Sequence, residues 1–208
     1  SLFSILSFFI FYVFFSVFVR CHSVTFLKLP EKIALILIPD TPGLFLQSKA
    51  LYRDYVIEEA IPFIKHKTGW FDPMMTTGCS MGAYHALNFF LQHPDVFNKV
   101  IALSGIYDAR FFVGEFGGDE AIYQNSPSDY IWHQNDGWFI DRYRQAEIVI
   151  CTGLGAWEQD GLPSFYKLKE AFDHKNIPAW FAEWGHDVAH DWDWWRKQMP
   201  YFLGQMYL

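Results

Sequence analysis

The feature that most constrains this chain is the pentapeptide Gly78-Cys79-Ser80-Met81-Gly82, which has the form Gly-x-Ser-x-Gly. Between a strand and a helix, this pattern is typical of a nucleophile elbow, a sharp turn whose glycines let the backbone cross itself closely. The turn presents the serine hydroxyl at a helix N-terminus, where backbone N–H groups favour negative charge. Because the pattern also occurs by chance, its meaning depends on whether the chain provides a sheet, a base and an acid.

Alternating apolar segments around this pentapeptide predict an α/β fold. Short apolar runs, most of them ending in polar residues or glycine, predict five strands, over 32–38, 74–78, 99–104, 147–152 and 177–184. Apolar residues at helical spacing predict four helices, over 49–65, 83–92, 162–174 and 191–203. Near-continuous apolar strands that alternate with helices indicate a mostly parallel sheet flanked by helices, and we expect 32–38 to be one of its buried parallel strands.

Residues 105–145 have weak periodicity and are rich in Gly, Asp, Asn, Tyr and Phe. Because some forty residues are long for a plain loop, we expect an insertion with short helices that covers a substrate.

The first thirty residues are a hydrophobic, aromatic-rich segment that we separate from a single domain over 31–208. Residues 1–19 carry no charge, and their length fits a membrane helix of ~20 residues. A signal peptide fits less well, because no positive region precedes the apolar stretch and no small-x-small site follows it. A segment foreign to the native protein and a pair of buried strands are the other interpretations. We expect a cytoplasmic protein, or a secreted or membrane-anchored one if residues 1–19 are a genuine signal or anchor.

Charge and cysteine content exclude several classes of function. The net charge is −7 without a basic run, which argues against nucleic-acid binding. The three scattered cysteines form neither a disulfide framework nor a C-x-x-C site, and we expect Cys79 and Cys151 to be buried. We predict no metal, because His186-x-x-x-His190 lies in a loop without H-E-x-x-H, and no cofactor.

A serine nucleophile needs a base, and His190 is the best placed of the eight histidines. It lies in a loop after the last predicted strand, at the sheet edge where catalytic groups gather in α/β proteins. His186 is the alternative in the same loop, whereas His85 lies inside the helix after the elbow and suits the core. The remaining histidines suit surfaces or element ends: His22, His66, His93, His133 and His174.

The base needs a carboxylate, which in the elbow fold lies between the serine and the histidine in sequence. Glu158 and Asp160 both follow the predicted strand 147–152, and Glu158 is favoured. Asp108, after the preceding strand, is a third alternative, although a loop carboxylate there more often caps local N–H groups.

An oxyanion hole needs two donors. The backbone N–H of Met81, directly after the serine, is the expected first donor. The second normally follows an early strand, and we find no convincing candidate upstream of Leu44.

Four stretches of the sequence carry a recognisable set of motifs: 78–86, 102–108, 185–187 and 190–195. Together they resemble the Putative esterase family of the α/β-hydrolase fold, which is similar to esterase D, feruloyl esterases, enterochelin esterases and the antigen-85 mycolyltransferases. The resemblance covers roughly Glu31 to the C-terminus. It implies an α/β-hydrolase fold, with the base at His190, two residues before Trp192, and the acid in Gly155-x-x-Glu158. Residues 1–30 do not resemble the start of the family, so we expect its early strands to be missing or replaced.

The function expected from these features is that of a serine carboxylic-ester hydrolase with the catalytic triad Ser80, Glu158 and His190. It would act on a small-molecule ester through an acyl-serine intermediate. A catalytically impaired or truncated α/β-hydrolase-like binding protein is the alternative. The sequence indicates no oligomeric state.

Overall fold

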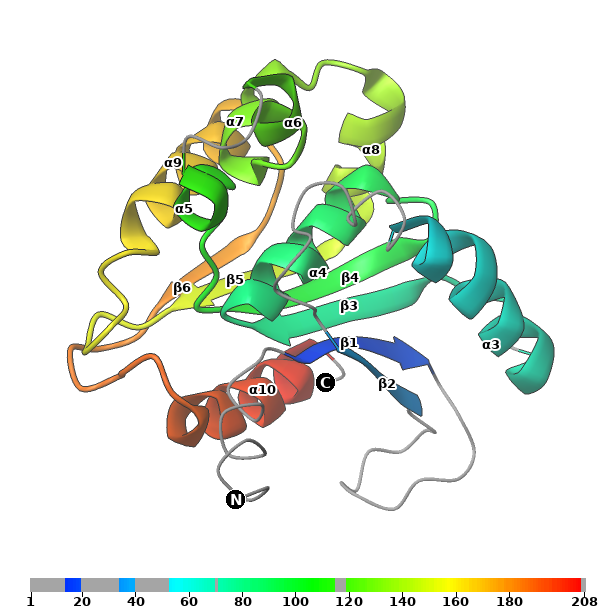
Figure 1. Cartoon of the computed structure of the whole chain (residues 1–208), viewed down its shortest axis with the longest axis horizontal. Coiled ribbons are helices and arrows are strands. Elements are labelled where there is room, and N and C mark those ends of the chain that lie inside the picture. Colours follow the sequence, from blue (N-terminus) through cyan, green and yellow to red (C-terminus); the bar gives the residue numbers. More distant parts are fainter. Residues whose placement is uncertain (1–13, 20–33, 40–52, 70, 115–118, 207–208) are drawn as a thin grey trace.

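A computed structural model describes residues 14–19, 34–39, 53–69, 71–114 and 119–206 (Figure 1). The described residues form a six-stranded sheet with the order β2-β1-β3-β4-β5-β6. The strands are β1 (Phe14–Val19), β2 (Ala34–Pro39), β3 (Met74–Cys79), β4 (Phe97–Leu103), β5 (Glu147–Thr152) and β6 (Trp180–Glu183). Neighbouring strands from β3 to β6 are parallel, whereas β1 is antiparallel to both β2 and β3.

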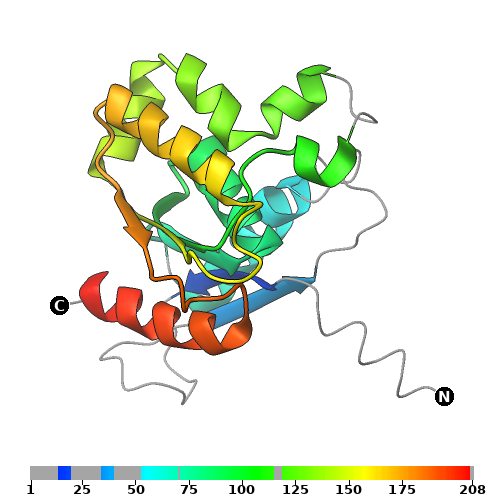
Figure 2. The same ribbon diagram turned by 90° about the vertical axis from the view of Figure 1, so that its left-hand side faces the viewer.

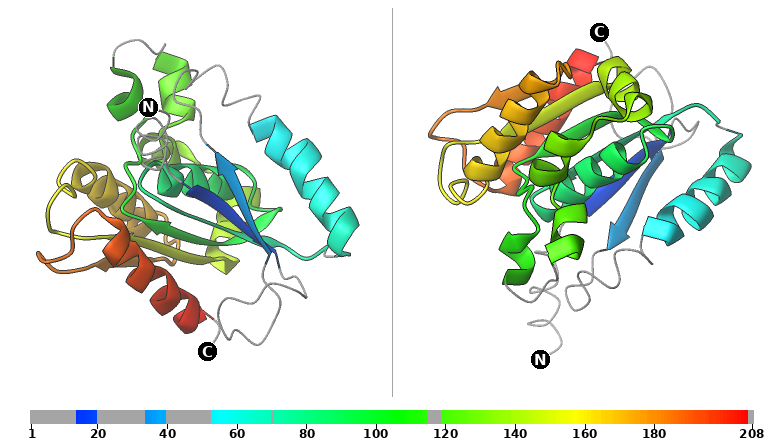
Figure 3. Two further views of the ribbon diagram at one scale, coloured as in Figure 1. Left: turned by 60° about the horizontal axis from the view of Figure 1, so that its bottom comes forward. Right: turned by 90° about the horizontal axis from the view of Figure 1, so that it is seen from above.

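Helices cover both faces of this sheet, so the predicted α/β architecture is confirmed. They are the π-helix η1 (Tyr55–Ala60), α3 (Ile61–Thr68), α4 (Met81–Gln92), α5 (Arg110–Val113), α6 (Asp119–Gln124), α7 (Pro127–His133), α8 (Gly137–Gln145), α9 (Leu162–His174) and α10 (Trp192–Met206). Helix α10 crosses one face of the sheet, and α4, α8 and α9 lie on the other (Figure 3).

Alternating side chains of the strands build two hydrophobic cores, one on each face. In β4, Val100 and Ala102 face the core under α4 and α9, whereas Ile101 and Leu103 face the core under α10. In β5, Ile148 and Ile150 point to the first core, and Val149 and Cys151 to the second. The strands are therefore buried on both sides, which explains their near-continuous apolar sequences.

The strand predicted over 32–38 is present as β2, but it does not lie beside a parallel strand as expected. Its partner is β1, which runs in the opposite direction, with Ile38 opposite Phe15. Apolar content identifies a buried strand but carries no information on the direction of its neighbour. Because β1 is also antiparallel to β3, β2 still runs in the same direction as β3.

Residues 14–19 of the hydrophobic N-terminal segment form β1 inside the sheet. Residues 1–13 and 20–33 lie outside the described residues, and so does the predicted boundary near residue 31. Within the part of the chain that the structure describes, no helix is both long and apolar enough to span a membrane.

The helix predicted over 49–65 is described from residue 53 and is divided into η1 and α3. Pro62 lies in the first turn of α3. Proline has no N–H to donate to the preceding turn, so the irregular turn falls where the proline interrupts the regular pattern. The expected insertion 105–145 contains the short helices α5 to α8.

Candidate active site

The turn after β3 has the geometry of a nucleophile elbow. Ser80 has φ 56° and ψ −123°, a conformation that a residue with a side chain rarely adopts. Helix α4 begins at the next residue, Met81. A Cβ on Gly78 would lie 2.3 Å from the carbonyl carbon and oxygen of Gly82, so the turn requires glycine at position 78. The Ser80 side chain is thereby held at the carboxyl edge of the sheet.

The predicted base lies beside this serine. His190 Nε2 is 2.8 Å from Ser80 Oγ, although the two residues are 110 positions apart in sequence. Figure 2 views the molecule from the side at which the loops after β5 and β6, yellow and orange, leave the sheet. The His190 N–H donates to the Ala156 carbonyl at 2.9 Å, which joins these two loops. A Cβ on Gly155 would lie 2.6 Å from the Val188 carbonyl oxygen, so the two loops cross in close contact.

The predicted acid, Glu158, completes the arrangement. Its side chain is only 1% exposed, and its Oε2 lies 3.4 Å from His190 Nδ1, at the long end of hydrogen-bond distances. A carboxylate at Nδ1 favours the tautomer with a proton there, which leaves Nε2 free to accept the serine proton. Two hydroxyls also donate to the carboxylate, Ser104 to Oε1 at 2.6 Å and Thr152 to Oε2 at 3.3 Å.

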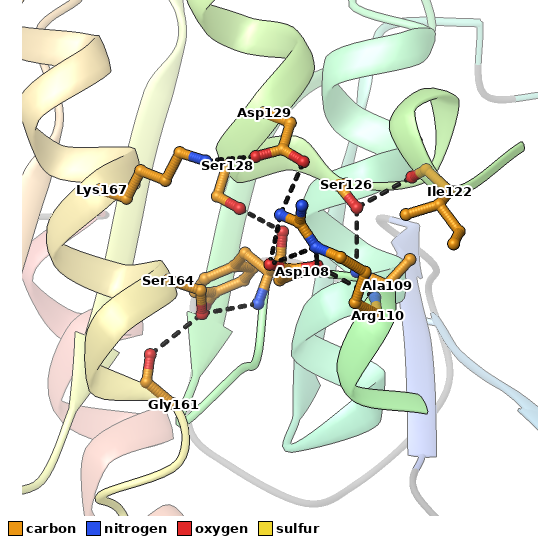
Figure 4. Close-up of polar contacts among 11 residues, drawn as sticks. Asp108, Ala109, Arg110, Ile122, Ser126, Ser128, Asp129, Gly161, Ser164 and Lys167 are labelled. Carbon is orange, nitrogen blue, oxygen red and sulfur yellow. Dashed lines mark hydrogen bonds and ion pairs between the residues drawn. The ribbon is translucent and has the colours of Figure 1, made fainter. Parts of the chain in front are cut away.

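Among the described residues, neither alternative acid hydrogen-bonds to the predicted base, His190. Asp108 is bound by Arg110, whose Nε donates to Oδ1 at 2.8 Å and whose Nη2 donates to Oδ2 at 2.6 Å (Figure 4). Burial raises the pKa of Asp108, but the side-chain and backbone hydrogen bonds from Arg110 outweigh it and hold the pKa below its usual value. Asp160 is exposed to solvent.

The environments of the two other histidines differ from that of His190. His186 is exposed, and His85 is buried in α4 with its ring edge-on to Tyr84 at a centroid distance of 5.1 Å. Over the residues that the structure describes, no group of three or more His, Cys, Asp or Glu side chains could hold a metal ion.

The predicted first oxyanion donor, the N–H of Met81, belongs to the first turn of α4. N–H groups in the first turn of a helix have no partner within the helix and can bind an anion. The sequence upstream of Leu44, in which a second donor was sought, falls mostly outside the described residues. Strand β2 ends at Pro39, which pairs with Phe14 of β1. The next residue of β1, Phe15, pairs with Gly78 of β3. The end of β2 therefore lies at the same edge of the sheet as the elbow.

Three residues of the site were not predicted: Ser104, Thr152 and Trp195. Trp195 Nε1 donates to Ser104 Oγ at 3.0 Å, and its ring packs edge-on against His190 at a centroid distance of 5.0 Å. Thr152 and Ser104 each stand at the carboxyl end of a parallel strand, which is the signal that could have identified them.

A polar cluster ties the helices of the insertion to α9. Arg110 of α5 contacts Asp108 and also donates to Asp129 of α7 at 2.8 Å, and Asp129 in turn accepts from Lys167 of α9 (Figure 4). The insertion is therefore tied to α9, the helix that follows the loop carrying Glu158.

A cavity of about 530 Å³ lies elsewhere, between α4 and the insertion helices. Its lining includes Asn88, Gln92, Gln124 and Tyr130, but not Ser80, Glu158 or His190. This cavity is therefore separate from the cluster of serine, histidine and carboxylate.

A model of the family described as Putative esterase matches residues 46–206 of the chain. The chain belongs to this family. The suspected resemblance is thus confirmed over most of the sequence. A search of curated proteins finds no match.

Several solved structures of esterases and hydrolases share the fold of this member of the Putative esterase family. A ferulic acid esterase superposes with a TM-score of 0.58 at 22% identity, over 75% of this chain and 60% of its own. The S-formylglutathione hydrolase FrmB from Staphylococcus aureus gives 0.60 at 19% identity, over 84% and 69%. Mycobacterium tuberculosis MPT51 gives 0.60 at 12% identity, over 83% and 76%. These matches confirm the α/β-hydrolase fold, and the chain spans 60% of the length of the ferulic acid esterase.

Proposed function

We propose that this protein is a serine carboxylic-ester hydrolase that acts on a small-molecule ester through an acyl-serine intermediate. The observation that carries the proposal is the 2.8 Å distance between Ser80 Oγ and His190 Nε2. This distance lies within the range required for a base to take the proton of a nucleophile. Membership of the Putative esterase family supports the same class of reaction.

In the first half of the reaction, Ser80 Oγ attacks the ester carbonyl carbon as its proton passes to His190 Nε2. The carbonyl oxygen becomes an oxyanion, toward which the Met81 N–H at the start of α4 would donate. The oxyanion then collapses and breaks the bond to the alcohol oxygen. This oxygen takes the proton from His190 and leaves as the alcohol, and the acyl group stays on Ser80.

Water clears the acyl group by the same route in reverse. A water molecule gives a proton to His190 Nε2 as its oxygen attacks the acyl carbon. The second oxyanion collapses, Ser80 Oγ departs and takes that proton back, and the carboxylic acid is released. Glu158 accepts from Nδ1 throughout, which stabilises the imidazolium that forms in each half.

Release of nitrophenol from a short-chain nitrophenyl ester tests the proposal. We expect Ser80→Ala to lower kcat/KM by about 10³-fold or more, and Glu158→Gln by a similar order, because triad members act as a unit. Asp160→Asn, which removes an exposed carboxylate two residues from Glu158, is the matched control and should leave the rate unchanged. Nitrophenol release that does not depend on Ser80 would contradict the proposal and favour the catalytically impaired binding protein.

A further inference from the structure

Glu158, Ser104, Trp195 and His190 form a closed ring of contacts. Ser104 donates to Glu158 at 2.6 Å, Trp195 donates to Ser104 at 3.0 Å, and Glu158 lies 3.4 Å from His190. The Trp195 ring closes the circle by packing edge-on against the His190 imidazole, with 5.0 Å between centroids. Ser104, Glu158 and Trp195 are buried, so water does not compete strongly for these contacts.

The chemistry of the groups fixes the direction of each hydrogen bond. The indole nitrogen of Trp195 can only donate, so Ser104 Oγ must accept from it. The ionised Glu158 carboxylate can only accept, so the single hydroxyl proton of Ser104 points to Oε1. Trp195 therefore sets the orientation of the hydroxyl, and the hydroxyl holds one oxygen of Glu158.

The backbone of Ser104 supports a role for its side chain. Its φ is 53°, in the left-handed region where glycine is far easier to accommodate than serine. Strained residues of this kind persist where the surroundings hold them, and they cluster at functional sites. A serine at this position supplies a buried donor that glycine would not.

Glutamate also needs more restraint than aspartate would. Its side chain has one more rotatable bond, so more conformations must be excluded to hold the carboxylate at His190. Ser104 restricts those conformations at Oε1, and Thr152, whose hydroxyl also lies 3.1 Å from the Gly153 carbonyl oxygen, adds a weaker contact at Oε2.

We propose that Ser104 and Trp195 are positioning residues that hold the Glu158 carboxylate, and through it the His190 imidazole, in the orientation in which Nε2 faces Ser80. This proposal rests on the proposed function, because it assigns the ring a part in the same reaction. The hydrogen bonds of both residues lead to the Glu158 carboxylate and not to Ser80 Oγ or His190 Nε2.

The first test replaces Ser104 in two ways. Ser104→Ala removes the hydroxyl and leaves the backbone strain unchanged. Ser104→Gly removes the hydroxyl and relieves the backbone strain as well. We expect each variant to lower kcat on the nitrophenyl ester by about 10–100-fold with KM within about twofold, as is usual for outer partners of a reacting group. Asn176→Gly, which relaxes a left-handed residue outside the site (φ 52°), is the matched control and should keep the wild-type kcat.

A double-mutant cycle separates positioning from structural support. If Ser104 acts only through Glu158, Ser104→Gly should change kcat by less than about twofold in a Glu158→Gln background. A merely structural loss would have the same size in both backgrounds. The proposal would be overturned if Ser104→Gly lowered kcat by the same factor in the wild-type and Glu158→Gln backgrounds. It would also be overturned if the single variant Ser104→Gly kept the wild-type kcat.

Trp195→Phe provides a second variant that keeps a ring beside His190 but removes the indole N–H. It should lower kcat less than Ser104→Gly and add little when combined with it, because both changes act on one hydroxyl. Additive losses would show that Trp195 acts independently of Ser104 and would contradict the ring.

A proton NMR measurement keeps the proposal testable if the chain proves inactive. The His190 Nδ1–H beside a carboxylate should give a low-field resonance that disappears in Glu158→Gln. We expect this resonance to be lost or broadened in Ser104→Gly and kept in Asn176→Gly. An unchanged resonance in Ser104→Gly would overturn the positioning role, whereas an inactive wild type would overturn the proposed function alone.

Discussion

Two serines occupy equivalent positions at the ends of neighbouring strands. Ser80 follows β3 and donates its N–H to the Leu103 carbonyl at 2.9 Å, and Ser104 follows β4 and donates to the Cys151 carbonyl at 2.7 Å. Both have positive φ, at 56° and 53°. A left-handed serine thus follows each strand, with one hydroxyl directed to His190 and the other to Glu158. Each such conformation costs on the order of 1–3 kcal/mol, which the rest of the fold offsets.

The elbow should not tolerate a methyl group at Gly78. Gly78→Ala places a Cβ 2.3 Å from the backbone of Gly82, a clash that no side-chain movement can relieve. We expect a loss of several kcal/mol in the free energy of unfolding, measured by urea denaturation, together with loss of ester cleavage. Gly204→Ala is the matched control, because nothing lies within 4 Å of its Cβ position in α10. That change should instead add ~0.5–1 kcal/mol.

The cysteine beside the nucleophile should be inert in the folded protein. Burial raises the pKa of the Cys79 thiol to about 12, and only the thiolate reacts readily. We expect iodoacetamide at about pH 8 to leave Cys79 unlabelled until urea is added, when peptide mapping should detect the adduct. Cys151, whose thiol pKa is also raised by burial, should behave alike. The structure leaves Cys79 partly exposed, not buried as the sequence suggested, so rapid labelling of native Cys79 would contradict the raised pKa.

At the scale of elements, the charged cluster of Figure 4 links three helices through the Asp129 carboxylate, which contacts both Arg110 and Lys167. Arg110 lies on α5, Asp129 on α7 and Lys167 on α9, and Asp108 precedes α5. Isolated surface ion pairs contribute little, but a network around one bidentate arginine contributes more. The cluster thereby holds α5 and α7 to α9, the helix that follows the loop carrying Glu158.

Arg110→Gln should weaken this restraint in a manner that depends on pH. Because the hydrogen bonds from Arg110 outweigh burial and hold the pKa of Asp108 below its unfolded value, the stabilisation is present above about pH 4. It is lost as the pH falls through the lowered pKa. We expect Arg110→Gln to cost about 1 kcal/mol near neutral pH, and the difference from wild type to shrink below about pH 4 and in high salt.

Thermal unfolding across this pH range measures the effect of Arg110→Gln. Arg196→Gln is the matched control, since the Arg196–Asp193 pair is exposed at 3.5 Å within one turn of α10. It should shift the unfolding temperature little. A difference for Arg110→Gln that stays constant from neutral to acid pH would show that packing, rather than charge, holds the cluster.

At the scale of the whole molecule, β1 joins the N-terminal part of the chain to the main sheet. It lies between β2 and β3, so its removal would leave β2 without its partner and expose one edge of β3. Unpaired strand edges invite association with other chains. The N-terminal segment that looked most foreign in sequence therefore contributes to the sheet beside the elbow.

Truncation tests this dependence and the predicted boundary near residue 31 together. A chain that begins at Glu31 lacks β1, and we expect it to unfold at a lower temperature and to aggregate, as followed by size exclusion with light scattering. A chain that begins at Phe14 keeps all six strands that the structure describes and is the control. If the shorter chain matches the full chain in elution volume and unfolding midpoint, residues 31–208 are the autonomous domain.

The sequence predicts the location of a residue well when that residue directly follows a strand. Ser80, Glu158 and His190 each follow a predicted strand, and the ends of parallel strands meet at one edge, so their proximity could be predicted. The antiparallel direction of β1 could not, because pairing depends on neighbours rather than on composition. The contact of Ser104 with Glu158 could not be predicted either, because it depends on a left-handed backbone at Ser104 and on Trp195, 91 residues away.

The long sequence separations within the site have a consequence for its timing. Ser80 and His190 are 110 residues apart, and Glu158 and Ser104 are 54 apart. Contacts between distant parts of a chain form late and slowly, because a large loop must close first. Since His190 follows β6 and Trp195 lies in α10, the proposed ester cleavage would begin only after β6 and α10 have docked on the sheet. The rate at which esterase activity returns during refolding would therefore report the rate at which β6 and α10 dock on the sheet.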